Sequence, residues 1–160
     1  ERTFQLLTQV AGRAGRGDVH GEVVIQTYSP ENEAIGFAKD HDFLAFAARE
    51  LKDRAELNYP PFGRLICVLF SGENVEAVSC IANEYARVLH RRNPRNIQVL
   101  GPVEAPLARI KKLFRWQVVL KGQVSKPMRT LVRDVASEIN AEADRQKVKV
   151  SIDVDPMDML

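Results

Sequence analysis

The chain is poor in the residue types that define several specialised protein classes. Only two of its 160 residues are cysteine, Cys67 and Cys80. A disulfide framework is therefore excluded, and a four-ligand zinc site would need histidine as well. Both cysteines lie inside apolar runs, so we expect buried, unreactive thiols. No apolar run reaches the roughly 18 residues that span a bilayer, and the N-terminus has no signal-peptide layout. We expect a cytoplasmic protein without a membrane partner.

The chain also lacks a strong net charge. Its 23 Lys and Arg residues against 21 Asp and Glu residues leave +2, and its 45% hydrophobic and 28% charged content is ordinary for a folded globular protein. The charges are unevenly placed: residues 87–115 hold eight basic residues and one acid, whereas residues 31–56 hold seven acids and four bases. The basic stretch favours a polyanionic partner, and a solvated mixed face is the alternative.

Residues 1–58 are expected to form one unit, because the consecutive prolines Pro60 and Pro61 cannot continue a helix. Apolar residues at helical spacing predict a helix from the N-terminus that stops at Gly15 and Gly17. The run at 23–25 predicts a short buried strand. The apolar spacing over 32–57 predicts helix.

Residues 59–160 alternate between strand and helix patterns. Strands are expected at 65–70, 97–100, 114–121 and 148–154, with the second ended by Gly101-Pro102. Helices are expected at 73–90 and 126–143, the latter with Ser125 as its N-cap. The order β-α-β-β-α-β is typical of the ferredoxin-like (split βαβ) arrangement, in which both helices cover one sheet face. Trp116 falls on that face, so we expect it in the core rather than stacked on bases.

The most informative stretch is the nonapeptide QVAGRAGRG, which begins at Gln9. In a helix, Gln9, Arg13 and Arg16 share one face, and an amide with two guanidinium groups suits a phosphate or polyphosphate. Gly12 and Gly15 each cost about 1 kcal/mol inside a helix, which close approach of a partner would explain. An arginine delivered into a nucleotide site would stabilise the charge of phosphoryl transfer. A flexible, solvated glycine turn is the alternative.

This nonapeptide resembles motif VI of superfamily 2 helicases, Gln-x-x-Gly-Arg-x-x-Arg. The rest of the chain is similar to one family in that group, the primosomal protein N′ (PriA) family. The resemblance implies an ATP-dependent DNA helicase that moves 3′ to 5′, recognises stalled or branched forks, and reloads the replicative helicase with other primosome proteins. The segments that carry it, besides the nonapeptide, are Gly21–Thr27, Tyr59–Phe62, Gly101–Pro102, Ala105–Pro106, Phe114–Gln117 and Asp153–Pro156.

The chain contains no Gly-x-x-x-x-Gly-Lys-Ser/Thr phosphate loop and no Asp-Glu-x-His magnesium motif. The resemblance therefore implies that ATP and Mg²⁺ bind the full-length protein, that zinc binds a cysteine-rich region upstream, and that this chain alone binds none of them. It also implies an α+β chain in which residues 1–58 end a RecA-like helicase lobe 2 and residues 59–160 form the C-terminal domain. Because Gln9 follows so soon after Glu1, we expect an excised C-terminal piece.

The resemblance assigns roles to individual residues near the N-terminus. Gln9, Gly12, Arg13 and Arg16 would bind nucleotide. Arg13 and Arg16 would contact the γ-phosphate as catalytic residues, with Arg16 the preferred arginine finger.

The C-terminal domain of the family is associated with DNA and with the acidic tail of single-stranded DNA-binding protein. Four basic residues are candidates for DNA phosphate contacts, with a solvated loop as the alternative; they are Arg109, Lys111, Lys112 and Arg115. Lys126 and Arg129 are candidates for the acidic tail, because such a pocket needs cations beside apolar surface. No residue is expected to hold a metal, and we expect a monomer. A different class of function stays open: a non-catalytic ferredoxin-like module that binds nucleic acid or protein.

Overall fold

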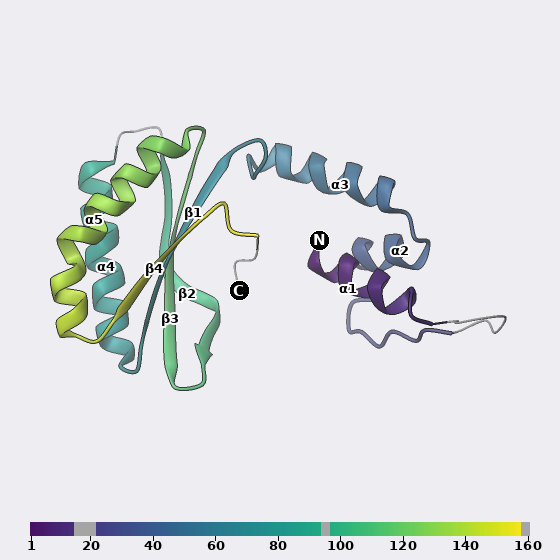
Figure 1. Cartoon of the computed structure of the whole chain (residues 1–160), viewed down its shortest axis with the longest axis horizontal. Coiled ribbons are helices and arrows are strands. Elements are labelled where there is room, and N and C mark those ends of the chain that lie inside the picture. Colours follow the sequence, from purple (N-terminus) through teal and green to yellow (C-terminus); the bar gives the residue numbers. More distant parts are fainter. Residues whose placement is uncertain (15–21, 94–96, 158–160) are drawn as a thin grey trace. The chain divides into compact units, whose positions relative to one another are not determined.

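The computed structural model describes residues 1–14, 22–93 and 97–157, and it is an α+β structure. The chain divides into two compact units, Glu1–Glu56 and Leu57–Leu160 (Figure 1). The described part of the first unit is helical, whereas the second unit contains a four-stranded sheet and two helices.

The first unit contains α1 (Arg2–Ala11), α2 (Glu33–Lys39) and α3 (Phe43–Glu56). Its small core consists of Phe4, Ala38 and Phe46, with partly buried apolar neighbours. The rings of Phe4 and Phe46 stack with their centroids 4.2 Å apart and their planes 2° apart. One aromatic residue from α1 and one from α3 thus form the centre of this unit.

The residues predicted to be helical over 32–57 form two helices, because the chain turns between α2 and α3. His41 adopts a left-handed backbone conformation with φ 52°, which ends the helical hydrogen-bond ladder. The Asp42 carboxylate then accepts a hydrogen bond from the Ala45 amide at 2.9 Å. Asp42 therefore satisfies an amide that the start of α3 would otherwise leave unpaired.

The buried strand predicted at 23–25 is also wrong. The three residues are in irregular backbone, and Val24 is 85% exposed. A strand is stable only when its backbone groups pair with a neighbour. The described part of the first unit contains no strand that could provide that pairing.

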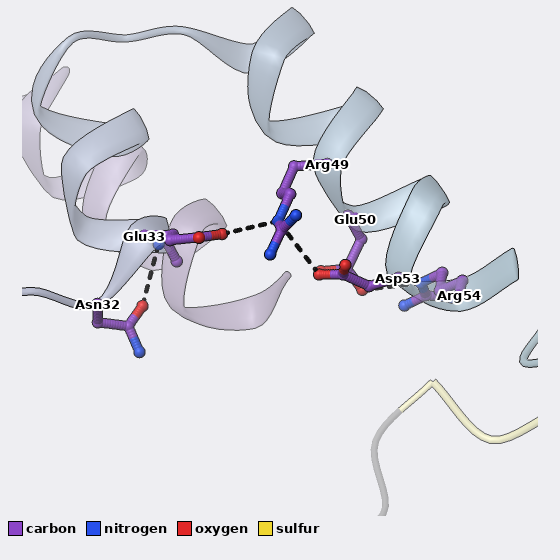
Figure 2. A network of polar contacts seen from close by, with 7 residues as sticks. Asn32, Glu33, Arg49, Glu50, Asp53 and Arg54 are labelled. Carbon is purple, nitrogen blue, oxygen red and sulfur yellow. Dashed lines mark hydrogen bonds and ion pairs between the residues drawn. The ribbon is translucent and has the colours of Figure 1, made fainter. Parts of the chain in front are cut away.

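Two arginines of α3 pair with carboxylates of the same unit (Figure 2). Arg49 Nε lies 3.0 Å from Glu33 on α2 and 3.6 Å from Asp53. The hydrogen bond to Glu33 is the main reason that the pKa of Arg49 is raised. Arg54 Nε lies 2.8 Å from Glu50, and its Nη2 reaches the carboxylate of Glu1 at 3.0 Å. Because these pairs are exposed or half-exposed, we assign them mainly an orienting role.

The second unit follows the predicted order of strands and helices. Its elements are β1 (Arg64–Gly72), α4 (Val75–Arg92), β2 (Gln98–Ile110), β3 (Leu113–Gly122), α5 (Ser125–Arg145) and β4 (Lys149–Val154). The strands lie in the order β2-β3-β1-β4, and each neighbouring pair is antiparallel. Both helices cover the same face of the sheet (Figure 1).

The core of the second unit lies between that face and the two helices. The predicted apolar stripes of α4 and α5 are buried in it, and Trp116 of β3 packs against it, which confirms the core prediction for Trp116. Cys67 is buried on β1, as expected, and burial raises its pKa. Cys80 is exposed on α4, so the expectation that both thiols are buried is wrong for that residue.

Strand β2 runs for 13 residues, through the Gly101-Pro102 step that was expected to end it at Leu100. The prolines at 102 and 106 are tolerated because β2 lies at the edge of the sheet, where one side of the strand needs no donors. Register shifts relative to β3 occur between Leu100 and Val103 and again between Glu104 and Arg109. The proline-containing stretch is therefore continuous with the sheet but irregularly paired.

The N-cap of α5 differs from the prediction. Val124 takes that position and its side chain makes no capping hydrogen bond, while Ser125 is already helical. The start of α4 is capped by Asn74, whose side-chain oxygen accepts from the Ala77 amide at 2.9 Å. A polar side chain therefore caps α4 but not α5.

Replacement of Tyr85 by phenylalanine is expected to destabilise the second unit by about 1 kcal/mol at neutral pH. Tyr85 is fully buried on α4 and its hydroxyl donates a hydrogen bond to the Val132 carbonyl of α5 at 2.8 Å. Burial raises its pKa, so the folded protein keeps the proton that the unfolded chain loses near pH 10. The contribution of the protonated Tyr85 to the free energy of unfolding is therefore complete below about pH 10. Above pH 10 that contribution falls by about 1.4 kcal/mol for each pH unit.

Urea unfolding followed by the fluorescence of Trp116, the single tryptophan of the chain, tests this at pH 8 and pH 11. The loss of stability between the two pH values should be smaller in Tyr85→Phe than in the parent. Tyr28→Phe is the control, since Tyr28 is fully exposed and lies in the other unit. Equal losses in parent and Tyr85→Phe would contradict the role given to this hydroxyl.

Candidate nucleotide and nucleic-acid sites

The described part of the helicase-like nonapeptide spans the end of α1. The helix ends at Ala11, Gly12 is its C-cap, and the Arg13 amide bonds the Val10 carbonyl at 3.0 Å, in a tighter turn than the α-helical one. The helix predicted to continue to Gly15 is therefore shorter than expected. Arg13 follows the helix instead of sharing an α-helical face with Gln9.

Gln9, Gly12 and Arg13 are all exposed, and Arg16 lies outside the described residues. The guanidinium group of Arg13 and the side-chain NH2 group of Gln9 can both donate hydrogen bonds to an anion at this position. The C-terminal end of a helix carries partial negative charge, so α1 itself does not attract a phosphate. Any affinity for phosphate here must come from the side chains. They suit a phosphate because Arg13 is positively charged and both side chains donate hydrogen bonds.

Four predicted DNA-contacting residues lie on one β-hairpin. Strands β2 and β3 are joined by the two-residue loop Lys111-Lys112, with Ile110 paired to Leu113 across it. Lys111 has φ 56°, the left-handed conformation that such short hairpin loops require. The structure thus places Lys111 and Lys112 at the hairpin tip, with Arg109 and Arg115 on the adjoining strands.

The arginines and lysines of this hairpin differ in how they are held. The Arg109 guanidinium lies 4.9 Å from the centre of the Phe114 ring, and Arg115 Nη1 donates to the Leu107 carbonyl at 3.3 Å. Lys111 and Lys112 are exposed, and neither forms an ion pair with any described residue. The hairpin therefore presents two uncommitted cations at its tip, behind two arginines that contact the hairpin itself.

The structure brings Lys126 and Arg129 together in a pocket of about 460 Å³ beside β4. Its other walls are Thr130 and Arg133 of α5 and Ile152 and Val154 of β4. The sequence analysis missed all four of these residues. Arg133 could have been found, since it lies one helical turn beyond Arg129. The two β4 residues could not, because their alternation predicts burial, whereas they are 42% and 38% exposed.

Neither a metal cluster nor a membrane span is found in the described ranges 1–14, 22–93 and 97–157. No three His, Cys, Asp or Glu side chains there are grouped so that they could hold a metal ion. None of the helices there combines the length and the apolar character needed to cross a bilayer.

Comparison with known proteins places the chain in a family. The family model described as "Primosomal protein N C-terminal domain" matches residues 55–157. The chain belongs to the PriA family. The replication restart protein PriA of Bacillus subtilis (strain 168) is 38% identical over 160 residues, which is 100% of this chain and 20% of that protein. PriA of Synechocystis sp. is 43% identical over 121 residues, which is 76% of this chain and 15% of that protein.

This finding confirms the resemblance to PriA drawn from the sequence. The chain spans 20% or less of the length of these two PriA relatives. Among solved structures, a hydantoinase/carbamoylase family amidase from Burkholderia ambifaria matches 57% of this chain at 17% identity, and its TM-score of 0.39 is too low to bear on the fold.

Proposed function

We propose that this chain is the C-terminal part of a PriA-type DNA helicase, a cytoplasmic enzyme that uses ATP to move 3′ to 5′, recognises stalled or branched forks and restarts replication through primosome assembly. The observation that carries the proposal is the match of the whole chain to a relative named replication restart protein PriA. In this proposal residues 1–58 end a RecA-like lobe 2. The strand order β2-β3-β1-β4, with both helices on one face, supports a ferredoxin-like C-terminal domain.

In the full-length protein, Gln9, Gly12, Arg13 and Arg16 would complete a nucleotide site whose phosphate loop is supplied by another part of the protein. ATP with Mg²⁺ supplies the phosphoryl group, and zinc would bind upstream of this chain. Arg13, which is exposed at the end of α1, would bind the terminal phosphate, and Arg16 would stabilise the charge that develops on it. Gln9 would orient the same phosphate by hydrogen bonding.

The test is DNA-stimulated ATP hydrolysis and fork unwinding by a full-length PriA that carries this chain. Turnover that rises when branched DNA is added is the expected result. A protein that binds branched DNA without hydrolysing ATP would favour the non-catalytic binding module instead.

The C-terminal domain would bind the DNA backbone through its basic hairpin. Lys111 and Lys112 are exposed and carry no ion pair with a described residue, so both can replace counterions on a phosphate backbone. Arg109 and Arg115 would add charge at the sides of the hairpin. Branched and single-stranded DNA are the proposed ligands.

The pocket at Lys126 and Arg129 would receive the acidic tail of single-stranded DNA-binding protein. Three cations from one face of α5 stand opposite two half-exposed aliphatic side chains of β4. That combination suits a peptide with carboxylates and an apolar residue.

Charge reversal of Arg129 to glutamate is expected to weaken binding of an acidic peptide with an apolar C-terminal residue by about tenfold, the loss typical of one charge-assisted contact. Fluorescence anisotropy with a labelled peptide measures this. Ile152→Ser should also weaken binding, whereas Lys52→Glu, an equal charge change on α3, should not. Equal affinity of the parent and Arg129→Glu would remove this pocket from the proposal.

A further inference from the structure

A second pocket lies at the end of the sheet from which the basic hairpin extends. Its volume is about 560 Å³, within the range of roughly 300–1,000 Å³ common for small-molecule sites. The residues that line it come from the end of β1, the turn before α4, the start of β3 and the turn between α5 and β4. Nothing in the proposed helicase or tail-binding roles uses it.

Two lysines provide the charge of this pocket. Lys147 lies in the turn after α5 and Lys149 begins β4; neither forms an ion pair with a described residue. Glu73 is the one acidic residue among the lining side chains. The pocket is therefore net positive and suits an anionic ligand.

The polar lining residues keep hydrogen-bonding capacity. The side-chain oxygen of Asn74 caps α4 by accepting from Ala77, which leaves its two N–H donors for a ligand. The side-chain nitrogen of Gln146 bonds Glu142 at 2.5 Å, which leaves its carbonyl oxygen as an acceptor. A donor and an acceptor beside cations can contact a base edge and its phosphate together.

Leu113 joins this pocket to the hairpin. It lines the pocket and directly follows Lys112, and its side chain is 42% exposed. The strand register extends the connection: Ser71 of β1 pairs with Arg115 on one side and with Lys149 on the other. Cations of β3 and β4 therefore flank the same residue of β1, so the basic surface continues from the hairpin to the pocket.

We propose that this pocket receives one unpaired nucleotide of a DNA strand whose phosphates lie along the hairpin. Leu113 packs against the face of the base, Asn74 and Gln146 meet its polar edge, and Lys147 and Lys149 pair with the adjacent phosphates. Proteins hold unstacked bases against aromatic or apolar side chains within a positively charged groove, and Leu113 provides the apolar surface here. The proposal rests on DNA binding by the hairpin and adds to it a preference for single strands.

The test compares binding of the 160-residue chain to a single-stranded oligonucleotide and to a blunt duplex of the same length. Lys149→Gln and Leu113→Ser should each lower affinity for the single strand by about tenfold and leave affinity for the duplex unchanged. The matched controls are Lys52→Gln, which removes a charge elsewhere, and Val124→Ser, which removes an exposed apolar side chain that follows the opposite end of β3, just before α5. Both should bind like the parent.

The possible results separate this proposal from the one on which it rests. The nucleotide pocket is wrong if Lys149→Gln and Leu113→Ser leave affinity for the single strand unchanged. It is also wrong if they lower affinity for the single strand and for the duplex by the same factor. If Lys111→Glu with Lys112→Glu still reduces binding in that case, DNA binding by the hairpin stands; if that double variant also binds like the parent, both proposals fail.

Photocrosslinking of the unaltered chain to single strands that contain 4-thiothymidine avoids dependence on how the variants fold. Crosslinks within residues 71–74, at Leu113 or within 146–149 are expected. Crosslinks confined to other residues would overturn the pocket proposal.

Discussion

Replacement of Arg16 by alanine lowers the kcat of DNA-stimulated ATP hydrolysis roughly a thousandfold or more in a full-length PriA that carries this chain, if Arg16 is the arginine finger. An arginine placed on the transferred phosphoryl group is worth about 10³–10⁵ in kcat, because it neutralises charge that exists only in the transition state. Affinity for DNA should change little, since this residue is assigned to nucleotide and not to nucleic acid. Steady-state ATPase assays at saturating DNA provide the measurement.

Three further variants sharpen the Arg16 experiment. Arg16→Lys should recover little activity, because a lysine cannot reproduce the planar, bidentate contact of a guanidinium group. Arg13→Ala should raise the KM for ATP as well as lower kcat, since a ground-state phosphate contact is assigned to it. Lys52→Ala on α3 controls for the loss of a charge. Undiminished turnover in Arg16→Ala would refute the finger, and lost DNA affinity with normal turnover per bound complex would indicate a binding role.

Reversal of both hairpin-tip charges, Lys111→Glu with Lys112→Glu, is expected to weaken DNA binding roughly 100-fold near 0.1 M salt. Each phosphate contact adds about 0.7–0.9 to the slope of log affinity against log salt concentration, so the loss of two contacts should flatten the slope by about 1.4 to 1.8. The loss should be similar for all base sequences, because backbone contacts carry no sequence information. Titrations by fluorescence anisotropy between about 50 and 200 mM salt measure both quantities.

The matched control for this experiment is Lys126→Glu with Arg129→Glu, which changes the charge of the same unit by the same amount. If the hairpin contacts DNA directly, the control should keep most of the parent's slope of log affinity against log salt concentration. Equal effects of the two double variants would mean that net charge alone, and not the hairpin, governs the binding.

The sequence predicted the second unit well because its elements have strong periodicity and strong neighbours. Phe114 to Lys121 alternates strictly, and the stripes of α4 and α5 bury as expected. The two errors in the strands share one physical cause, which is that strand limits depend on pairing. Gly101-Pro102 looks like an end in the sequence but lies in an edge strand, whereas Val23 to Ile25 looks like a strand but has no partner among the described residues of its unit.

For the candidate sites, the sequence identified the residues, whereas their arrangement in space came from the structure. Lys111, Lys112, Lys126 and Arg129 stand out in the sequence as cations, and the structure adds that two form a hairpin tip and two line a pocket. The pocket beside Leu113 had no signal in the sequence, because its walls come from three segments far apart along the chain. Only the register of β1 with β3 and β4 brings those segments together.

The two prolines in β2 have a consequence for how copies of this chain meet one another. A strand from a second molecule can extend a sheet only where a row of free N–H and C=O groups is offered, and proline removes N–H groups from that row. At one border of the sheet, Pro102, Pro106 and two register shifts interrupt the row. The opposite border, β4, is six residues long. Composition therefore disfavours the addition of a second molecule at the β2 border, and β4 is the border where such an addition would meet an uninterrupted row.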